Sequence, residues 1–124
     1  MPREFKRSTR VAEQLQRELA ELIRRELTDP RAGMVTVTAV ELSKDLAYAK
    51  VFVSALGGKL APSELIGMLQ HASGYYRHEL GQALRLRILP ELRFHYDATE
   101  ERAAHLEDLI ARANAKPGDG SDKP

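Results

Sequence analysis

The stretch MVTVTAVELSKDLAYAKVFVS, residues 34–54, decides the fold of this 124-residue chain. Residues 34–42 are rich in β-branched side chains, and residues 47–54 alternate between two sets of side chains, so both segments are typical of β-strands. The short polar link Ser43-Lys44-Asp45 suits the turn between two antiparallel neighbours. The sequence therefore predicts a β-hairpin as the centre of a small sheet.

Helical patterns lie on both sides of this hairpin. Apolar residues at three- and four-residue spacing predict an amphipathic helix over residues 9–27, which ends before Pro30 because proline disfavours helical geometry. After the hairpin, helices are predicted over residues 62–71 and 74–84, and a last strand over residues 87–96. This order predicts an α+β fold in which three helices cover one face of a three-stranded sheet.

The chain changes in character after Asp97. Residues 99–113 have the spacing of an amphipathic helix, whereas residues 115–124 contain nothing to bury and are predicted to be disordered. We therefore expect one domain over residues 5–97, an appended helix over residues 98–114, and a disordered tail over residues 115–124.

Composition excludes several classes of protein. The chain has no cysteine, which rules out disulfide scaffolds and thiolate catalysis and favours a reducing compartment. No apolar run approaches the roughly 20 residues of a membrane span, and no apolar signal core follows Met1, so we expect a cytoplasmic protein.

Residues 1–96 carry a net charge of +4 and residues 97–124 carry −3. Such asymmetry suits a body that faces a polyanion, although a balanced solvated surface explains it equally well.

Motifs for catalysis and for cofactor binding are incomplete. Gly57-Gly58-Lys59 lacks the earlier glycine and the following Ser or Thr of a phosphate-binding loop. His78-Glu79 lacks the second histidine of a zinc-protease helix, because the required position holds Gln82. We therefore expect no enzymatic activity, no cofactor and no metal site.

The N-terminal segment is basic. Only Glu4 opposes the four positive charges of Arg3, Lys6, Arg7 and Arg10. We interpret this segment as a mobile basic arm that contacts phosphate groups.

Ala72-Ser73-Gly74 interrupts the two central helices. Small residues let the backbone bend and let another chain come close, and the N-terminus of the second helix favours a phosphate. Arg77 lies one turn further on, and Arg85 and Arg87 follow at the exit of that helix. From the pattern alone, a tight corner between two helices explains this kink equally well.

Several motifs, in order, resemble the bacterial ribosome-binding factor A family between about residues 5 and 110. They are Arg10-Val11-Ala12, Thr28-Asp29-Pro30-Arg31, residues 42–53 (LSKDLAYAKVFV), Ala72-Ser73-Gly74, and residues 84–92 (LRLRILPEL) with Phe94, Tyr96 and Asp97.

The resemblance implies a type II KH-like domain with an Ala-x-Gly kink in place of the usual Gly-x-x-Gly loop. It also implies a monomeric, non-catalytic factor that binds the immature small (30S) ribosomal subunit and its 16S rRNA and assists late rRNA maturation. The resemblance further implies a role in cold adaptation, and it implies maturation GTPases and ribosomal proteins as partners. Type II KH domains contact RNA around the kink. Carried onto this chain, that places the following residues near RNA, beside the basic arm: Lys44, Lys50, Ala72, Ser73, Gly74, Arg77 and Arg85.

Alternatives remain open at this point. A general RNA chaperone on the same fold would bind unrelated RNA as well as the subunit, and an RNA-processing enzyme would need a catalytic cluster that the spacing does not supply. Tyr48 and Phe52 suit either base stacking or the core, and the core is the commoner place for aromatic residues on strands. The acidic extension after Asp97 is not expected to follow a phosphate backbone.

Overall fold

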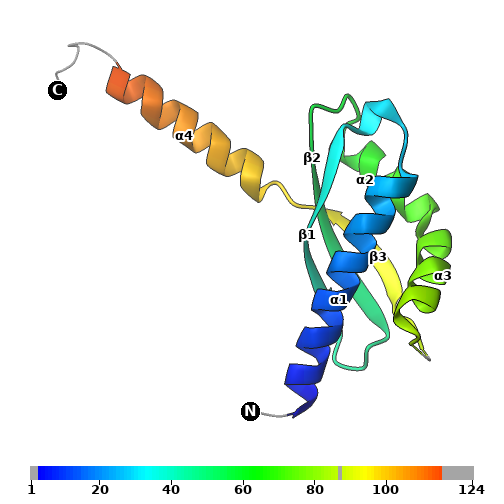
Figure 1. Cartoon of the computed structure of the whole chain (residues 1–124). Coiled ribbons are helices and arrows are strands. Elements are labelled where there is room, and N and C mark those ends of the chain that lie inside the picture. Colours follow the sequence, from blue (N-terminus) through cyan, green and yellow to red (C-terminus); the bar gives the residue numbers. More distant parts are fainter. Residues whose placement is uncertain (1–2, 87, 116–124) are drawn as a thin grey trace.

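The computed structural model describes the backbone of residues 3–86 and 88–115 and the side chains of residues 9–86, 88–99 and 106–114. Its elements are α1 (Arg3–Glu26), a short 3-10 helix (Pro30–Ala32), β1 (Met34–Leu42), β2 (Tyr48–Leu56), α2 (Pro62–His71), α3 (Ser73–Leu84), β3 (Glu91–Tyr96) and α4 (Thr99–Ala115). Helices α1, α2 and α3 cover one face of the sheet, and α4 leads away from it (Figure 1). The predicted α+β order is confirmed.

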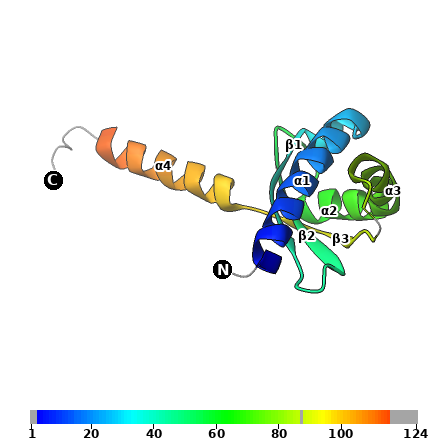
Figure 2. The ribbon, with the colours of Figure 1, turned by 60° about the horizontal axis from the view of Figure 1, so that its bottom comes forward.

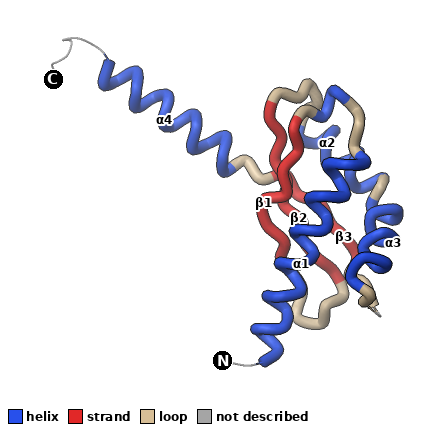
Figure 3. The backbone as a smooth tube through the Cα atoms, viewed as in Figure 1, coloured by secondary structure: helices blue, strands red, loops and turns tan. Residues whose placement is uncertain are grey.

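The three strands lie in the order β1-β2-β3 (Figure 3). β1 and β2 pair antiparallel, from Met34 opposite Leu56 to Leu42 opposite Ala49, as the hairpin prediction requires. β3 returns after α2 and α3 and pairs with β2 in the parallel sense. A parallel pair needs such a helical crossover, because a two-residue turn cannot join parallel strands.

One apolar layer joins the sheet to the helices. Alternate residues of each strand point toward the helices and meet the apolar stripes of α1, α2 and α3, and each fully buried aliphatic side chain contributes about 1.5–3 kcal/mol. The residues that are at most 1 % exposed are Leu15, Leu19, Ile23, Ala49, Val51, Val53, Leu69 and Leu80. The opposite face of the sheet has no helix over it among the described elements (Figure 2).

Gln70 ties the end of α2 to the free edge of β3. Its Nε2 donates to the carbonyl of Leu92 at 2.9 Å, and its Oε1 accepts from the N–H of Phe94 at 3.0 Å. β3 is an edge strand and has no neighbouring strand on this side. The Gln70 carboxamide takes the place of that neighbour, because it satisfies one donor and one acceptor of the β3 backbone.

Asp29 caps the 3-10 helix that follows α1. Its carboxylate accepts from the N–H of Arg31 at 2.9 Å and pairs with the Arg31 guanidinium at 2.8 Å. Hydrogen bonds from the Arg31 side chain and backbone lower the pKa of Asp29 to about 2. The predicted end of the first helix before Pro30 is confirmed.

Two boundaries differ from those predicted by more than two residues. Residues 3–10 continue α1 without a break, so the interpretation of this segment as a mobile arm is wrong. No proline or glycine stands between Arg3 and Glu26, and the charged residues there are good helix formers. β3 begins at Glu91 rather than at residue 87, because Pro90 has no N–H to donate to a ladder, and Arg87 lies outside the described residues.

No helix within the described residues combines the length and the apolar character needed to cross a membrane.

Replacing Gln70 with alanine will lower the free energy of unfolding by about 1–3 kcal/mol, because it leaves a donor and an acceptor of the β3 edge unpaired. Urea denaturation measures the change. Gln82→Ala is the matched control, since the exposed Gln82 side chain contacts His78 on its own helix. Equal stability of the two variants would show that the Gln70 bridge contributes nothing to the fold.

Candidate nucleic-acid interface

Ala72 alone separates α2 from α3. It has φ −90° and ψ 3°, a bridge-region conformation, and it ends one helix and precedes the other. Its N–H points back to the carbonyls of Met68 and Leu69, while its carbonyl accepts from Tyr76 in the first turn of α3. The predicted kink is therefore a change of helix direction within a single residue.

The N-terminus of α3 is open. Among the described residues no side chain caps its first turn, so the first N–H groups of the helix remain for water or a ligand. A Cβ atom added to Gly74 would meet nothing within 4 Å, and its φ is not in the left-handed region. Neither packing nor backbone geometry requires glycine at this position.

A shallow groove of about 480 Å³ lies beside this turn and is lined by Gly74, Arg77, His78, Ile88 and Leu89. Arg77 Nη2 donates to the carbonyl of Leu89 at 2.8 Å, which ties α3 to the connection that leads to β3. Arg77 therefore supports the wall of the groove as well as supplying positive charge.

Lys44 lies at the tip of the β1–β2 hairpin and is exposed. The turn is held by Asp45, whose Oδ1 accepts from the Ser43 hydroxyl at 2.7 Å and from the Ala47 N–H at 3.1 Å. These two hydrogen bonds hold the pKa of Asp45 below its ordinary value. The Asp45 carboxylate is thus engaged within the turn, next to the exposed ammonium group of Lys44.

Arg85 ends α3 in the left-handed conformation, with φ 55° and ψ 36°, and its N–H donates to the Gly81 carbonyl at 3.0 Å. This conformation costs a non-glycine residue about 1–2 kcal/mol, and glycine is the usual occupant. The side chain is exposed. The fold therefore tolerates strain at a position where the sequence keeps a charged residue.

The sequence-predicted residues fall into separate groups. The kink (Ala72, Ser73 and Gly74) lies at one end of α3 and Arg85 at the other, about 18 Å away for a helix of this length. The hairpin tip lies toward the Arg85 end, since the Glu91 N–H donates to the Ala47 carbonyl there at 2.9 Å.

The basic residues of α1 lie at the start of that helix, which Figure 1 and Figure 2 show at the hairpin end of the domain. Arg10 is exposed, whereas the side chains of Arg3, Lys6 and Arg7 lie outside the described ones.

Lys50 belongs to neither group. It lies on β2 and faces away from the helices, opposite Glu41 of β1 and Arg93 of β3. Tyr48 and Phe52 share this open face and are half-buried, so they are not core residues of the helix-covered layer.

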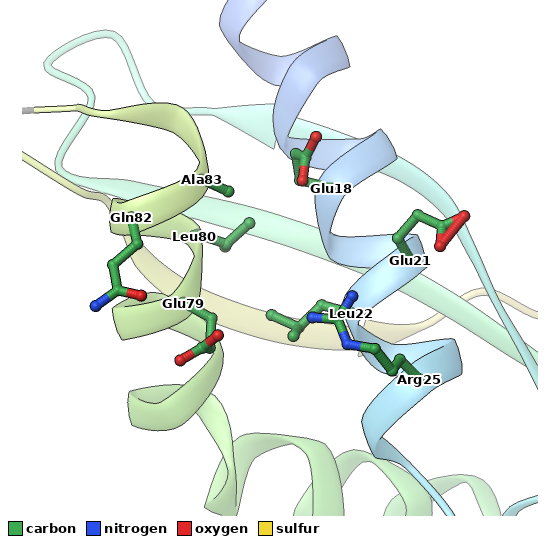
Figure 4. Close-up of a pocket in the computed structure, with 8 residues that line it drawn as sticks. All are labelled: Glu18, Glu21, Leu22, Arg25, Glu79, Leu80, Gln82 and Ala83. Atoms are coloured by element: carbon green, nitrogen blue, oxygen red, sulfur yellow. The ribbon is translucent and has the colours of Figure 1, made fainter.

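The groove between α1 and α3, about 300 Å³ in volume, has the opposite charge (Figure 4). Glu18, Glu21 and Glu79 line it, against the single base Arg25 among its lining residues, and Leu80 contributes apolar surface. A phosphate backbone is repelled by this arrangement, so this groove is not suited to a polyanion.

The sequence is similar to those of known proteins. The family model described as ribosome-binding factor A matches residues 7–110. A ribosome-binding factor A from Hahella chejuensis is 52 % identical over 128 aligned residues, which cover 98 % of this chain and 95 % of that protein. The chain belongs to the ribosome-binding factor A family.

Solved structures of family members have the same fold. The crystal structure of ribosome-binding factor A from Thermus thermophilus is 35 % identical, with a TM-score of 0.64 over 72 % of this chain and 94 % of that one. A homology model of the Thermus thermophilus factor, fitted into a cryo-EM map of its 30S complex, is 36 % identical, with a TM-score of 0.62 over 70 % and 91 % of the two chains. The fold is KH-like, as the resemblance implied.

Within the part of the chain that the structure describes, no three His, Asp or Glu side chains gather in a way that could hold a metal ion.

Arg85→Gly will raise the free energy of unfolding by about 1 kcal/mol, because glycine adopts the left-handed conformation without the penalty of a side chain. Arg85→Ala keeps that penalty and will give no increase. Thermal denaturation of both variants measures the difference. A glycine variant no more stable than the alanine variant would show that position 85 is unstrained.

Proposed function

We propose that this chain is an assembly factor that binds the immature small (30S) ribosomal subunit through its 16S rRNA and assists late maturation of that RNA in the cytoplasm. Two observations support the proposal: membership of the ribosome-binding factor A family, and a Thermus thermophilus member fitted into a map of a 30S complex. Residues 5–97 form the RNA-binding domain in this proposal.

The kink carries the RNA contact. An uncapped helix N-terminus presents N–H donors and the positive end of a dipole, which suits a phosphate. Gly74 gives a phosphate backbone room to approach, and Arg77 stands beside it. Lys44, Arg85 and the start of α1 supply positive charge at the other end of α3 for a second backbone segment.

The mechanism is binding rather than catalysis. Contacts at both ends of α3 stabilise an RNA arrangement in which two backbone segments lie on either side of one rigid helix. A factor that binds one arrangement of a junction more tightly than another shifts the junction toward the first by its difference in affinity. Release by a maturation GTPase then needs only to reverse that difference.

Sedimentation of the purified protein with immature and mature subunits tests the proposal. We expect stronger association with immature subunits than with mature subunits or with an unrelated RNA of equal length. Equal binding to all three would instead identify a general RNA chaperone.

Gly74→Ala will weaken association with immature subunits roughly tenfold or more, because the added methyl group displaces an RNA backbone and loses a charge-assisted hydrogen bond worth about 1.5–3 kcal/mol. It will leave the melting temperature unchanged or slightly higher, since alanine is the better helix former. Gly67→Ala on α2 is the matched control, because a Cβ there also meets nothing within 4 Å. If both variants bind equally well, the kink is a structural corner only.

Arg85→Gly will weaken subunit association even though it stabilises the fold. It will also flatten the slope of log affinity against log salt concentration by about 0.7–0.9, the effect of one lost phosphate contact. Sedimentation at several salt concentrations measures both effects. An unchanged slope would place the phosphate contacts away from the end of α3.

A further inference from the structure

The sheet face that points away from the helices carries two contacts between an aromatic ring of β2 and a planar side chain of β3. The guanidinium of Arg93 lies over the ring of Tyr48, 4.0 Å from its centroid. The rings of Phe52 and His95 lie 5.5 Å apart between centroids and are tilted by 31°. Both pairs join β2 to β3, where Lys50 stands opposite Arg93.

Each pair has a half-buried aromatic ring from β2 and an exposed planar group from β3. The Tyr48 ring lies under the Arg93 guanidinium, and the Phe52 ring lies beside the His95 ring, so each planar group of β3 has a ring contact on β2 and a face left for a ligand. Arg93 and His95 are two residues apart on one strand, which separates them by about 6.6 Å. Planar groups at such a spacing are platforms on which successive bases of a single strand can stack.

Arg93 keeps donors for a ligand. Its Nε contacts Glu91 at 3.3 Å, and its terminal nitrogens make no hydrogen bond to the described part of the chain. Lys50 adds a second exposed cation between the two platforms. Planar stacking surfaces interleaved with cations match a strand of bases joined by phosphates, whereas an apolar protein surface needs neither.

The appended helix α4 leaves this face uncovered. Asp97 accepts from the Thr38 hydroxyl at 2.7 Å and donates its N–H to the Val53 carbonyl at 2.7 Å, so the chain crosses the sheet beyond Phe52. α4 then leads away from the sheet, with Ile110 about half exposed (51 %) (Figure 2).

We propose that the open sheet face, with Arg93 over Tyr48 and His95 beside Phe52 as two stacking platforms, binds single-stranded RNA. This surface lies on the other side of the sheet from the kink, so the domain holds RNA on both faces. The inference rests on the proposed RNA-binding function but concerns a separate site.

Fluorescence anisotropy with a fluorescein-labelled single-stranded RNA of about 12 nucleotides tests it on the full chain. Arg93→Ala and His95→Ala will each weaken binding roughly 5- to 150-fold, the range for loss of one stacked base. Arg93→Lys keeps the charge but not the plane and will also weaken binding. Arg24→Ala is the matched control, because Arg24 is also exposed and also paired with a nearby glutamate, Glu21. We expect the Arg24→Ala variant to bind the RNA as tightly as the unaltered protein does.

Four results would overturn the inference. The first is unchanged RNA affinity in both alanine variants, and the second is full RNA affinity in Arg93→Lys. The third is tighter RNA binding by Ile110→Ser, a variant that removes an apolar side chain of α4. The fourth is weaker subunit association in the alanine variants without loss of RNA affinity. The third result would mean that α4 covers the face, and the fourth that a ribosomal protein binds there. A double variant separates this site from the kink: Arg93→Ala will weaken oligonucleotide binding by the same factor in the Gly74→Ala background as in the unaltered protein, because the two sites lie on opposite faces of the sheet.

Discussion

The candidate contact at the kink depends on the two hydrogen bonds that the Gln70 carboxamide makes with the edge of β3. They fix the last turn of α2 against the sheet, and Ala72, two residues later, changes the helix direction. α3 therefore starts from a point set by β3, although β3 comes later in the chain. A helix end that is anchored in this way presents its N–H groups in one direction, which a phosphate site needs.

Local sequence signals were sufficient wherever neighbouring residues determine the structure. The hairpin and the helix Pro62–His71 follow from alternation, turn residues and a proline at the first helical position, and all three act within a few residues. The kink was predictable for the same reason, because small residues between two helical patterns mark a break. The expected mobile arm was wrong because basic charge says nothing about helix propensity, which favours α1 from Arg3 onward.

The side-chain contacts on the open sheet face could not be predicted from such local signals. Alternation shows that Arg93 and His95 share a face of their strand, but not which strand lies beside them. Only the parallel register of β3 with β2 brings these residues against Tyr48 and Phe52, and that register is set by a crossover of two helices. The Arg77 contact with Leu89 was equally inaccessible, since it joins two residues through the return of the chain after α3.

Two positions on the surfaces proposed to bind RNA hold residues that are not the most stabilising choice for their local backbone conformation. Gly74 occupies a helical position with room for a side chain, and Arg85 occupies a left-handed position that suits glycine. If stability alone decided the two residues, glycine would stand at position 85 and alanine at position 74. Position 74 instead holds glycine and position 85 arginine, at opposite ends of α3. The proposed RNA contacts account for both residues with a single ligand, whose backbone approaches position 74 and whose phosphate meets position 85.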